Sequence, residues 1–222
     1  MDSNLLFLLI AKNRFCIFKS VNGDEFYIIY ISNPINGLIS YNLIDYKIIN
    51  KIKNAHDKKI VDIRHFGDKI NKNDVILSAT IYSNIKLWNF THWECLLNLE
   101  TIYSKGYMYS TCFLTENNLN YIITCHCTSH CEPIKVYDFY GNNIKEIFES
   151  NEETFYVDSY YDIELSKTFL ITCNKGFIKS YDFKNNILFQ KYFDKEQTKV
   201  DFYRDIIIYS DEKLIKINCT KK

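Results

Sequence analysis

The stretch of residues 77–90, with the sequence LSATIYSNIKLWNF, decides the fold of this chain. It contains an apolar run that ends at Thr80, a short polar segment, and a second run that ends on Trp88 and Asn89. Short runs that are rich in apolar and β-branched residues and separated by a polar turn predict two antiparallel strands. The stretch therefore predicts a β-hairpin within a larger sheet.

The second half of this hairpin recurs along the chain. IKLWNF at 85–90 returns as IKVYDF at 134–139 and IKSYDF at 178–183, with weaker copies LISYNL at 38–43 and LIKIN at 214–218. The aromatic residue of the copies lies at positions 41, 88, 137 and 181, which gives spacings of 47, 49 and 44 residues. Periods of roughly 40 to 45 residues are typical of four-stranded propeller blades.

Each full copy has the neighbours that a four-stranded repeat needs. Very apolar runs precede the copies at 75–80, 121–125 and 169–173, and more polar, alternating segments follow at 91–99, 143–148 and 186–192. Residues 56–66, 106–114 and 155–165 supply a candidate innermost strand. The pattern predicts an all-β chain, a β-propeller of about five four-stranded blades in a single domain, 1–222. The predicted blade units are 20–54, 55–100, 101–150, 151–194 and 195–222.

The stretch 77–90 closely resembles the WD-repeat signature, in which a buried strand ends in Ser-x-Ser/Thr and a tight turn leads into Ile-x-Leu-Trp-Asp. The residues around Tyr137 and Tyr181 are similar to it more weakly, and the resemblance covers residues 20–218. The wider stretch 54–194 resembles a divergent, protist-like WD-repeat protein. The resemblance implies a propeller that binds other proteins and brings no biochemical activity with it.

The three repeats that match the WD-repeat signature best, around Trp88, Tyr137 and Tyr181, lack one feature of that family. The family carries a turn aspartate six residues before the Trp, which ties a histidine of the preceding loop to the strands. That position holds Tyr82, Cys131 or Lys175 in this chain. His56 matches the family's loop histidine, but without the aspartate we expect it to be a surface residue.

The length is the second departure from the family. Seven WD blades need on the order of 300 residues, and this chain has 222. Unpaired sheet edges are normally covered or paired. We therefore expect either a compact five-bladed ring or an incomplete one, which a second copy, another chain or a missing segment completes.

Composition excludes several classes of partner. Because 27 basic residues balance 27 acidic ones, a broad positive field for nucleic acid is missing. We expect no membrane span, since no apolar window approaches ~20 residues, and we interpret residues 5–11 as a buried first strand rather than a signal peptide.

Several of the eight cysteines lie in apolar runs, which favours a reducing, cytoplasmic location.

We find no motif for nucleotide binding, for a serine nucleophile or for a metalloprotease, so we predict no catalytic residue and no cofactor. One set of metal-ligand types stands out: Cys125, Cys127, His130 and Cys131. Thiolate and imidazole are preferred zinc ligands, but this spacing is not a recognised zinc signature. We favour an enlarged surface turn and predict no metal.

Tyr103, Tyr107 and Tyr109 form an aromatic cluster in a predicted loop, and exposed tyrosines are common interface anchors. We expect this cluster to be the contact patch for a protein partner. The expected function is a non-catalytic interaction scaffold of the WD-repeat type. The alternative is a small ligand-binding or hydrolytic five-bladed propeller that uses its central channel.

Overall fold

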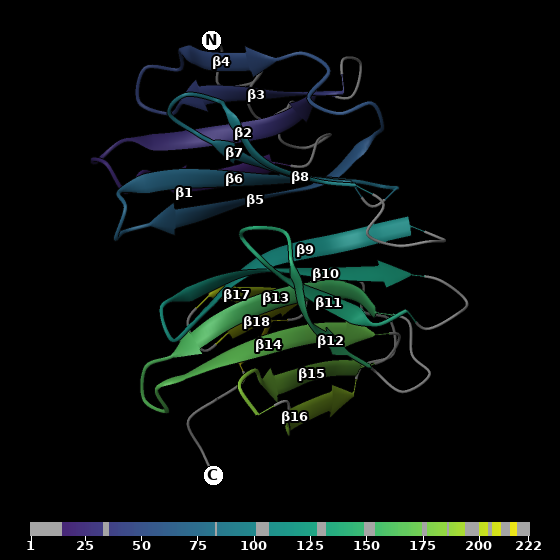
Figure 1. Cartoon of the computed structure of the whole chain (residues 1–222). Helices are drawn as coiled ribbons and strands as arrows, with labels where there is room; N and C mark the ends of the chain where they lie inside the picture. Colours follow the sequence, from purple (N-terminus) through teal and green to yellow (C-terminus); the bar gives the residue numbers. More distant parts are fainter. Residues whose placement is uncertain are drawn as a thin grey trace. The chain divides into compact units, whose positions relative to one another are not determined.

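The computed structural model describes residues 15–32, 36–82, 84–100, 107–127, 132–148, 154–174, 177–185, 187–193, 200–203, 206–209 and 214–216. Regular structure in these ranges consists of strands, which pair into five antiparallel sheets (Figure 1). Contacts divide the chain into two compact units, Met1–Ser104 and Lys105–Lys222. No helix in the described ranges is long and apolar enough to cross a membrane.

The first unit holds two four-stranded sheets, each a meander in which neighbours in sequence pair in space. The strands of the first sheet are β1 (Phe15–Lys19), β2 (Phe26–Ser32), β3 (Gly37–Asn42) and β4 (Ile48–Ile52). Those of the second are β5 (Ile60–Asp68), β6 (Asn73–Thr80), β7 (Ile85–Asn89) and β8 (Cys95–Leu99).

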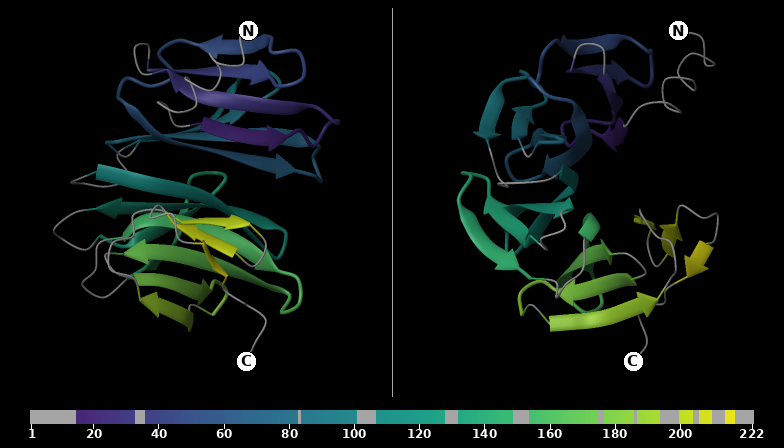
Figure 2. Two further views of the ribbon diagram at one scale, coloured as in Figure 1. Left: turned by 180° about the vertical axis from the view of Figure 1, so that it is seen from behind. Right: turned by 90° about the vertical axis from the view of Figure 1, so that its right-hand side faces the viewer.

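The second unit continues the same pattern, coloured teal to yellow in Figure 2. Its first sheet contains β9 (Tyr107–Glu116), β10 (Leu119–Cys127), β11 (Ile134–Asp138) and β12 (Asn143–Ile147). The next contains β13 (Thr154–Asp162), β14 (Lys167–Asn174), β15 (Phe177–Asp182) and β16 (Ile187–Phe193). The last contains three described strands, β17 (Val200–Tyr203), β18 (Ile206–Tyr209) and β19 (Leu214–Lys216).

These sheets confirm the predicted all-β class and the four strands of a repeat. The motif copies form the third strand of their sheets, and the apolar runs before them form the second. In β6 every side chain from Asp74 to Thr80 is buried, as expected of a strand covered on both faces. Closure of a five-bladed ring stays a prediction.

Within each unit the sheets share an apolar core. Phe18 and Ile29 of the first sheet belong to the same buried cluster as Ile63, Ile76 and Trp88 of the second. In the second unit, Leu114 and Ile123 join Val157, Leu170 and Phe183 in the same way. Complete burial of each such side chain contributes about 1.5–3 kcal/mol, so the facing sheets stabilise each other.

A β-bulge recurs between the third and fourth strands of the four-stranded sheets. The register shifts at the motif aromatic in each case, between Ser40 and Tyr41, Leu87 and Trp88, Val136 and Tyr137, and Ser180 and Tyr181. The repeats therefore share a backbone irregularity as well as a sequence pattern.

Candidate functional site: a hydrogen-bonded chain beside a polar pocket

His56 lies in the segment between β4 and β5, and its imidazole is bonded at both nitrogens. Nε2 lies 2.7 Å from the hydroxyl oxygen of Ser78 on β6, and Nδ1 lies 2.6 Å from Oδ1 of Asn84. The indole Nε1–H of Trp88 on β7 donates to the same Ser78 hydroxyl at 2.8 Å. His56 is only 2 % exposed, so the expectation of a surface histidine is wrong.

The expectation was wrong because His56 bonds to a residue other than the aspartate of the signature. No aspartate stands six residues before Trp88, but Asn84, four residues before it, lies in the turn after β6 and offers an amide oxygen. An amide oxygen accepts a hydrogen bond from an imidazole N–H as a carboxylate does, without adding a charge. Asn84 in this turn was the signal that could have identified His56 as structural.

Burial lowers the pKa of His56 to about 4, since a charged imidazole would lose its hydration there. The bond to Asn84 raises the pKa, and the charge of Lys86 lowers it further. The imidazole is therefore neutral at neutral pH and carries one proton. With that proton on Nδ1, His56 donates to Asn84 and accepts from the Ser78 hydroxyl, which accepts from Trp88.

The chain of hydrogen bonds continues from Asn84 toward the surface. Its Nδ2 donates to Oδ1 of Asn98 on β8 at 2.9 Å and to the carbonyl oxygen of Leu99 at 3.2 Å. Asn98 Nδ2 in turn donates to Glu100 Oε1 at 2.9 Å. The donors thus run in one direction, from a buried indole to an exposed carboxylate.

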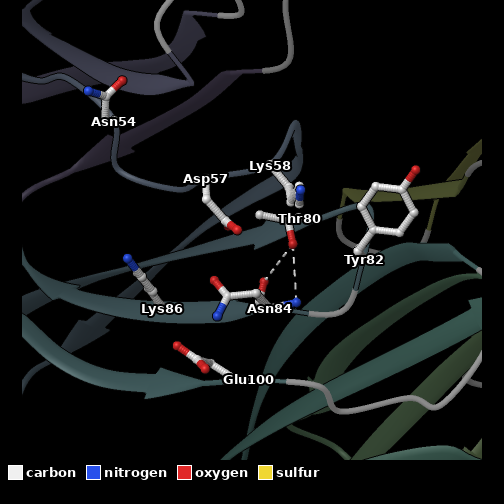
Figure 3. Close-up of a pocket in the computed structure, with 8 residues that line it drawn as sticks. All are labelled: Asn54, Asp57, Lys58, Thr80, Tyr82, Asn84, Lys86 and Glu100. Carbon is white, nitrogen blue, oxygen red and sulfur yellow. Dashed lines mark hydrogen bonds between the residues drawn. The ribbon is translucent and has the colours of Figure 1, made fainter.

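A polar pocket of about 470 Å³ lies at this end of the second sheet (Figure 3). Its lining residues come from the segment after β4, from the turn between β6 and β7, and from the ends of β6, β7 and β8: Asn54, Asp57, Lys58, Thr80, Tyr82, Asn84, Lys86 and Glu100. Two acidic and two basic side chains line it. The pocket therefore offers charges of both signs.

Lys86 has a structural partner. Its ammonium group donates to the carbonyl oxygen of Ala55 at 2.8 Å and lies 5.6 Å from the centre of the Trp88 ring. Asp57, Lys58 and Glu100, by contrast, make no ion pair with any residue in the described ranges. These three charges face solvent at the pocket.

A second polar cluster joins the two sheets of the first unit around Asp74, which is 1 % exposed. The Ser20 hydroxyl donates to Oδ2 at 2.7 Å, the Val21 N–H donates at 3.3 Å, and His65 Nε2 bonds to Oδ1 at 2.7 Å. The ring of His65 stacks on Phe18 with centroids 3.8 Å apart. Burial lowers the pKa of His65, against the opposing effect of Asp74.

This cluster holds a serine, a histidine and an aspartate, but their order does not activate the serine. Ser20 and His65 both bond to Asp74, and no hydrogen bond joins them to each other. A nucleophilic hydroxyl needs a base that takes its proton, with the acid behind the base. The cluster instead fixes the turn between β1 and β2 against the second sheet.

The predicted contact patch falls partly on the described residues. Tyr107 and Tyr109 lie two residues apart on strand β9 and not in a loop, so the loop prediction is wrong for them. They are 46 % and 40 % exposed, while Tyr103 lies outside the described residues. The Tyr109 ring meets Phe155 edge-on, with centroids 5.9 Å apart.

Two of the four zinc candidates, Cys125 and Cys127, lie among the described residues. Cys125 is fully buried in the core of the second unit, and a bulge follows it. Cys127 ends β10, whereas His130 and Cys131 lie outside the described residues. Among the residues that the structure describes, no three His, Cys, Asp or Glu side chains form a group that could hold a metal ion.

Sequence reasoning missed the pocket because its charged residues sit in unrelated stretches of the chain. Asp57 and Glu100 are 43 positions apart in sequence, and neither belongs to a recognisable motif. A comparison of the sequence with models of known protein families and with curated proteins finds no match.

Proposed function

We propose that this chain is a protein-interaction scaffold of the WD-repeat type, built as a propeller of about five blades and without catalytic activity of its own. The observation that carries the proposal is the hydrogen-bonded set of Trp88, Ser78, His56 and Asn84. In WD repeats a turn residue ties a loop histidine to the strands, and Asn84 does this for His56. This set supports a WD-type assignment for the second sheet.

The placement of the polar side chains supports binding rather than catalysis. The buried Ser78 and His56 and the half-buried His65 of the first unit hold loops and strands in place. The pocket at the loop end offers fixed polar groups to a partner. Tyr107 and Tyr109 on β9, together with Tyr103, remain the proposed aromatic contact patch.

The proposal includes a cytoplasmic location, protein partners, no cofactor, and no binding to nucleic acid or membranes. Cysteine side chains that are buried in the core, as at Cys112, Cys125 and Cys173, support a reducing compartment.

We also propose that a second copy or another chain completes the propeller. The last sheet has three described strands, with β19 at its edge, and such an edge is a template for another strand. Size-exclusion chromatography with light scattering tests this on the purified chain. A dimer supports completion by a second copy, and a stable monomer that takes up no other chain contradicts completion.

The scaffold function is tested by cross-linking the tagged chain in its own cells and identifying the proteins that copurify. Each candidate is then produced separately, and its affinity for the chain is measured by calorimetry. A partner that binds with a defined stoichiometry and a Kd at or below about 10 µM supports the function. The absence of any such partner contradicts it, as does turnover of a small substrate by the pure chain.

A further inference from the structure

The pocket at the end of the second sheet has two walls, and both are fixed. One wall belongs to the segment around Ala55 and His56, and the other to the ends of β6, β7 and β8. Ala55 is 1 % exposed in the core, its carbonyl oxygen accepts from Lys86, and His56 bonds to Ser78 and Asn84. A site that is ordered before binding loses less entropy when a ligand enters.

The residues that follow these anchors carry the exposed charges. Asp57 and Lys58 come directly after His56, so their backbone is held while their side chains face the pocket. Glu100 is oriented from the opposite wall, because Asn98 donates to its carboxylate and Asn84 donates to Asn98. In Figure 3 the carboxylates of Asp57 and Glu100 lie on opposite sides of Asn84.

The charges at the pocket define what fits it. Asp57 and Glu100 offer carboxylates without an ion pair among the described residues, whereas the Lys86 ammonium group already bonds to Ala55. Lys58 adds a cation that is likewise without an ion pair there. A ligand with both charges satisfies the pocket, while a ligand with one charge leaves the opposite charge of the pocket unpaired.

We infer that this pocket binds a polar segment of a protein partner in which a basic side chain lies within a few residues of an acidic one. The basic group lies between the carboxylates of Asp57 and Glu100, and the acidic group pairs with the ammonium of Lys58. This inference rests on the proposed scaffold function and names the chemistry of the partner.

The test uses short acetylated and amidated peptides with one Arg and one Glu separated by zero to three alanines. Binding is followed by NMR through the side-chain amide signals of Asn84, which lines the pocket, and of Asn98, to which Asn84 donates. We expect saturable shifts with a Kd of about 1 mM for at least one spacing. Replacing Arg by citrulline, or Glu by Gln, should weaken binding at least about fivefold, since one charge-assisted contact is lost.

Variants of the chain complete the test. Asp57→Asn and Glu100→Gln should each weaken the best peptide at least about threefold, whereas Glu94→Gln should not, because Glu94 precedes β8 at its other end. All three residues are exposed, so the variants should keep the melting temperature of the parent chain.

The inference is overturned if no peptide gives a saturable shift at either amide, or if the citrulline and Gln peptides bind as well as the charged one. It is also overturned if Glu94→Gln weakens binding as much as Glu100→Gln. If a partner found in cells binds the Asp57→Asn/Glu100→Gln chain with unchanged affinity, the scaffold function holds and this pocket is not its site.

Discussion

Nε2 of His56 and the hydroxyl oxygen of Ser78 lie 2.7 Å apart, and this contact joins a loop to the second strand of its sheet. Both residues are buried, His56 at 2 % exposure and Ser78 at 0 %. A buried hydrogen-bonding group that loses its partner costs about 1–3 kcal/mol, so the two residues depend on each other.

Replacement of His56 by alanine should lower the free energy of unfolding by about 3 kcal/mol. The variant leaves Ser78 and Asn84 without their buried partner and opens a cavity under the loop. Urea unfolding measures the change. His92→Ala is the matched control, because His92 is exposed in a turn of the same sheet, and it should change stability by less than about 0.5 kcal/mol.

Stability should fall as the pH is lowered from 6.5 to 4. Because the pKa of His56 is about 4 in the folded chain and 6.5 as the ordinary value, the unfolded chain binds the extra proton within this window. The contribution of the neutral imidazole, about 3 kcal/mol, is complete above pH 6.5 and is lost by pH 4. The lowered pKa of His65 acts in the same direction.

Unfolding free energies measured at a series of pH values test this expectation. In the His56→Ala variant the free energy of unfolding should change less steeply with pH across the window. At its largest, the difference in slope from the parent chain should correspond to about one bound proton. An unchanged slope would mean that His56 titrates alike in the folded and unfolded chain.

Gly67→Ala should destabilise the first unit by about 1–3 kcal/mol. A Cβ at this position of β5 would lie 2.5 Å from Cγ1 of Val21, in the turn between β1 and β2, where the chain passes closely. Gly23→Ala is the control, since a Cβ there meets nothing within 4 Å.

A double-mutant cycle identifies the cause of the Gly67 effect. Val21→Ala removes the clashing methyl group, so the Val21→Ala/Gly67→Ala chain should lose less stability than the sum of the two single changes. Strictly additive losses would show that the close approach to Val21 is not what excludes a side chain at Gly67.

Thiol alkylation should separate the described cysteines by burial. Cys95 is exposed and should react first, while Cys125 and Cys173 are fully buried and should react at least about 100-fold more slowly. Burial also raises the pKa of the Cys16 thiol to about 12, which removes its reactive thiolate. Peptide-resolved mass spectrometry after timed alkylation measures each site, with the urea-unfolded chain as the reference at which the rates converge.

The repeat made the strands predictable from sequence. Runs such as 75–80 and 169–173 are apolar because the second strand of each sheet is buried on both faces, and the burial of β6 and β14 bears this out. Strand type and order follow from such local patterns, which need no knowledge of distant contacts.

The polar contacts were not predictable, since they depend on residues that are distant in sequence. Asp74 accepts a hydrogen bond from the hydroxyl of Ser20, which lies 54 positions away in sequence, and no local pattern connects the two residues. The wrong expectation for His56 has a related cause, because its acceptor is Asn84 and not the aspartate of the WD-repeat signature that the sequence resembles. A search for any turn residue with an acceptor oxygen, instead of an aspartate at a fixed spacing, would have identified Asn84 as the partner of His56.

The bulge beside the motif aromatic also bears on solubility. The fourth strands β4, β8, β12 and β16 are sheet edges with exposed apolar side chains, among them Ile48, Leu96, Ile144 and Ile187. A sheet edge that is flat and carries exposed apolar side chains recruits other chains into aggregates. Because a bulge bends and twists the strand that carries it, the irregularity between the third and fourth strands works against flat edge-to-edge stacking. A sheet straightened by design at this position would therefore risk precipitation.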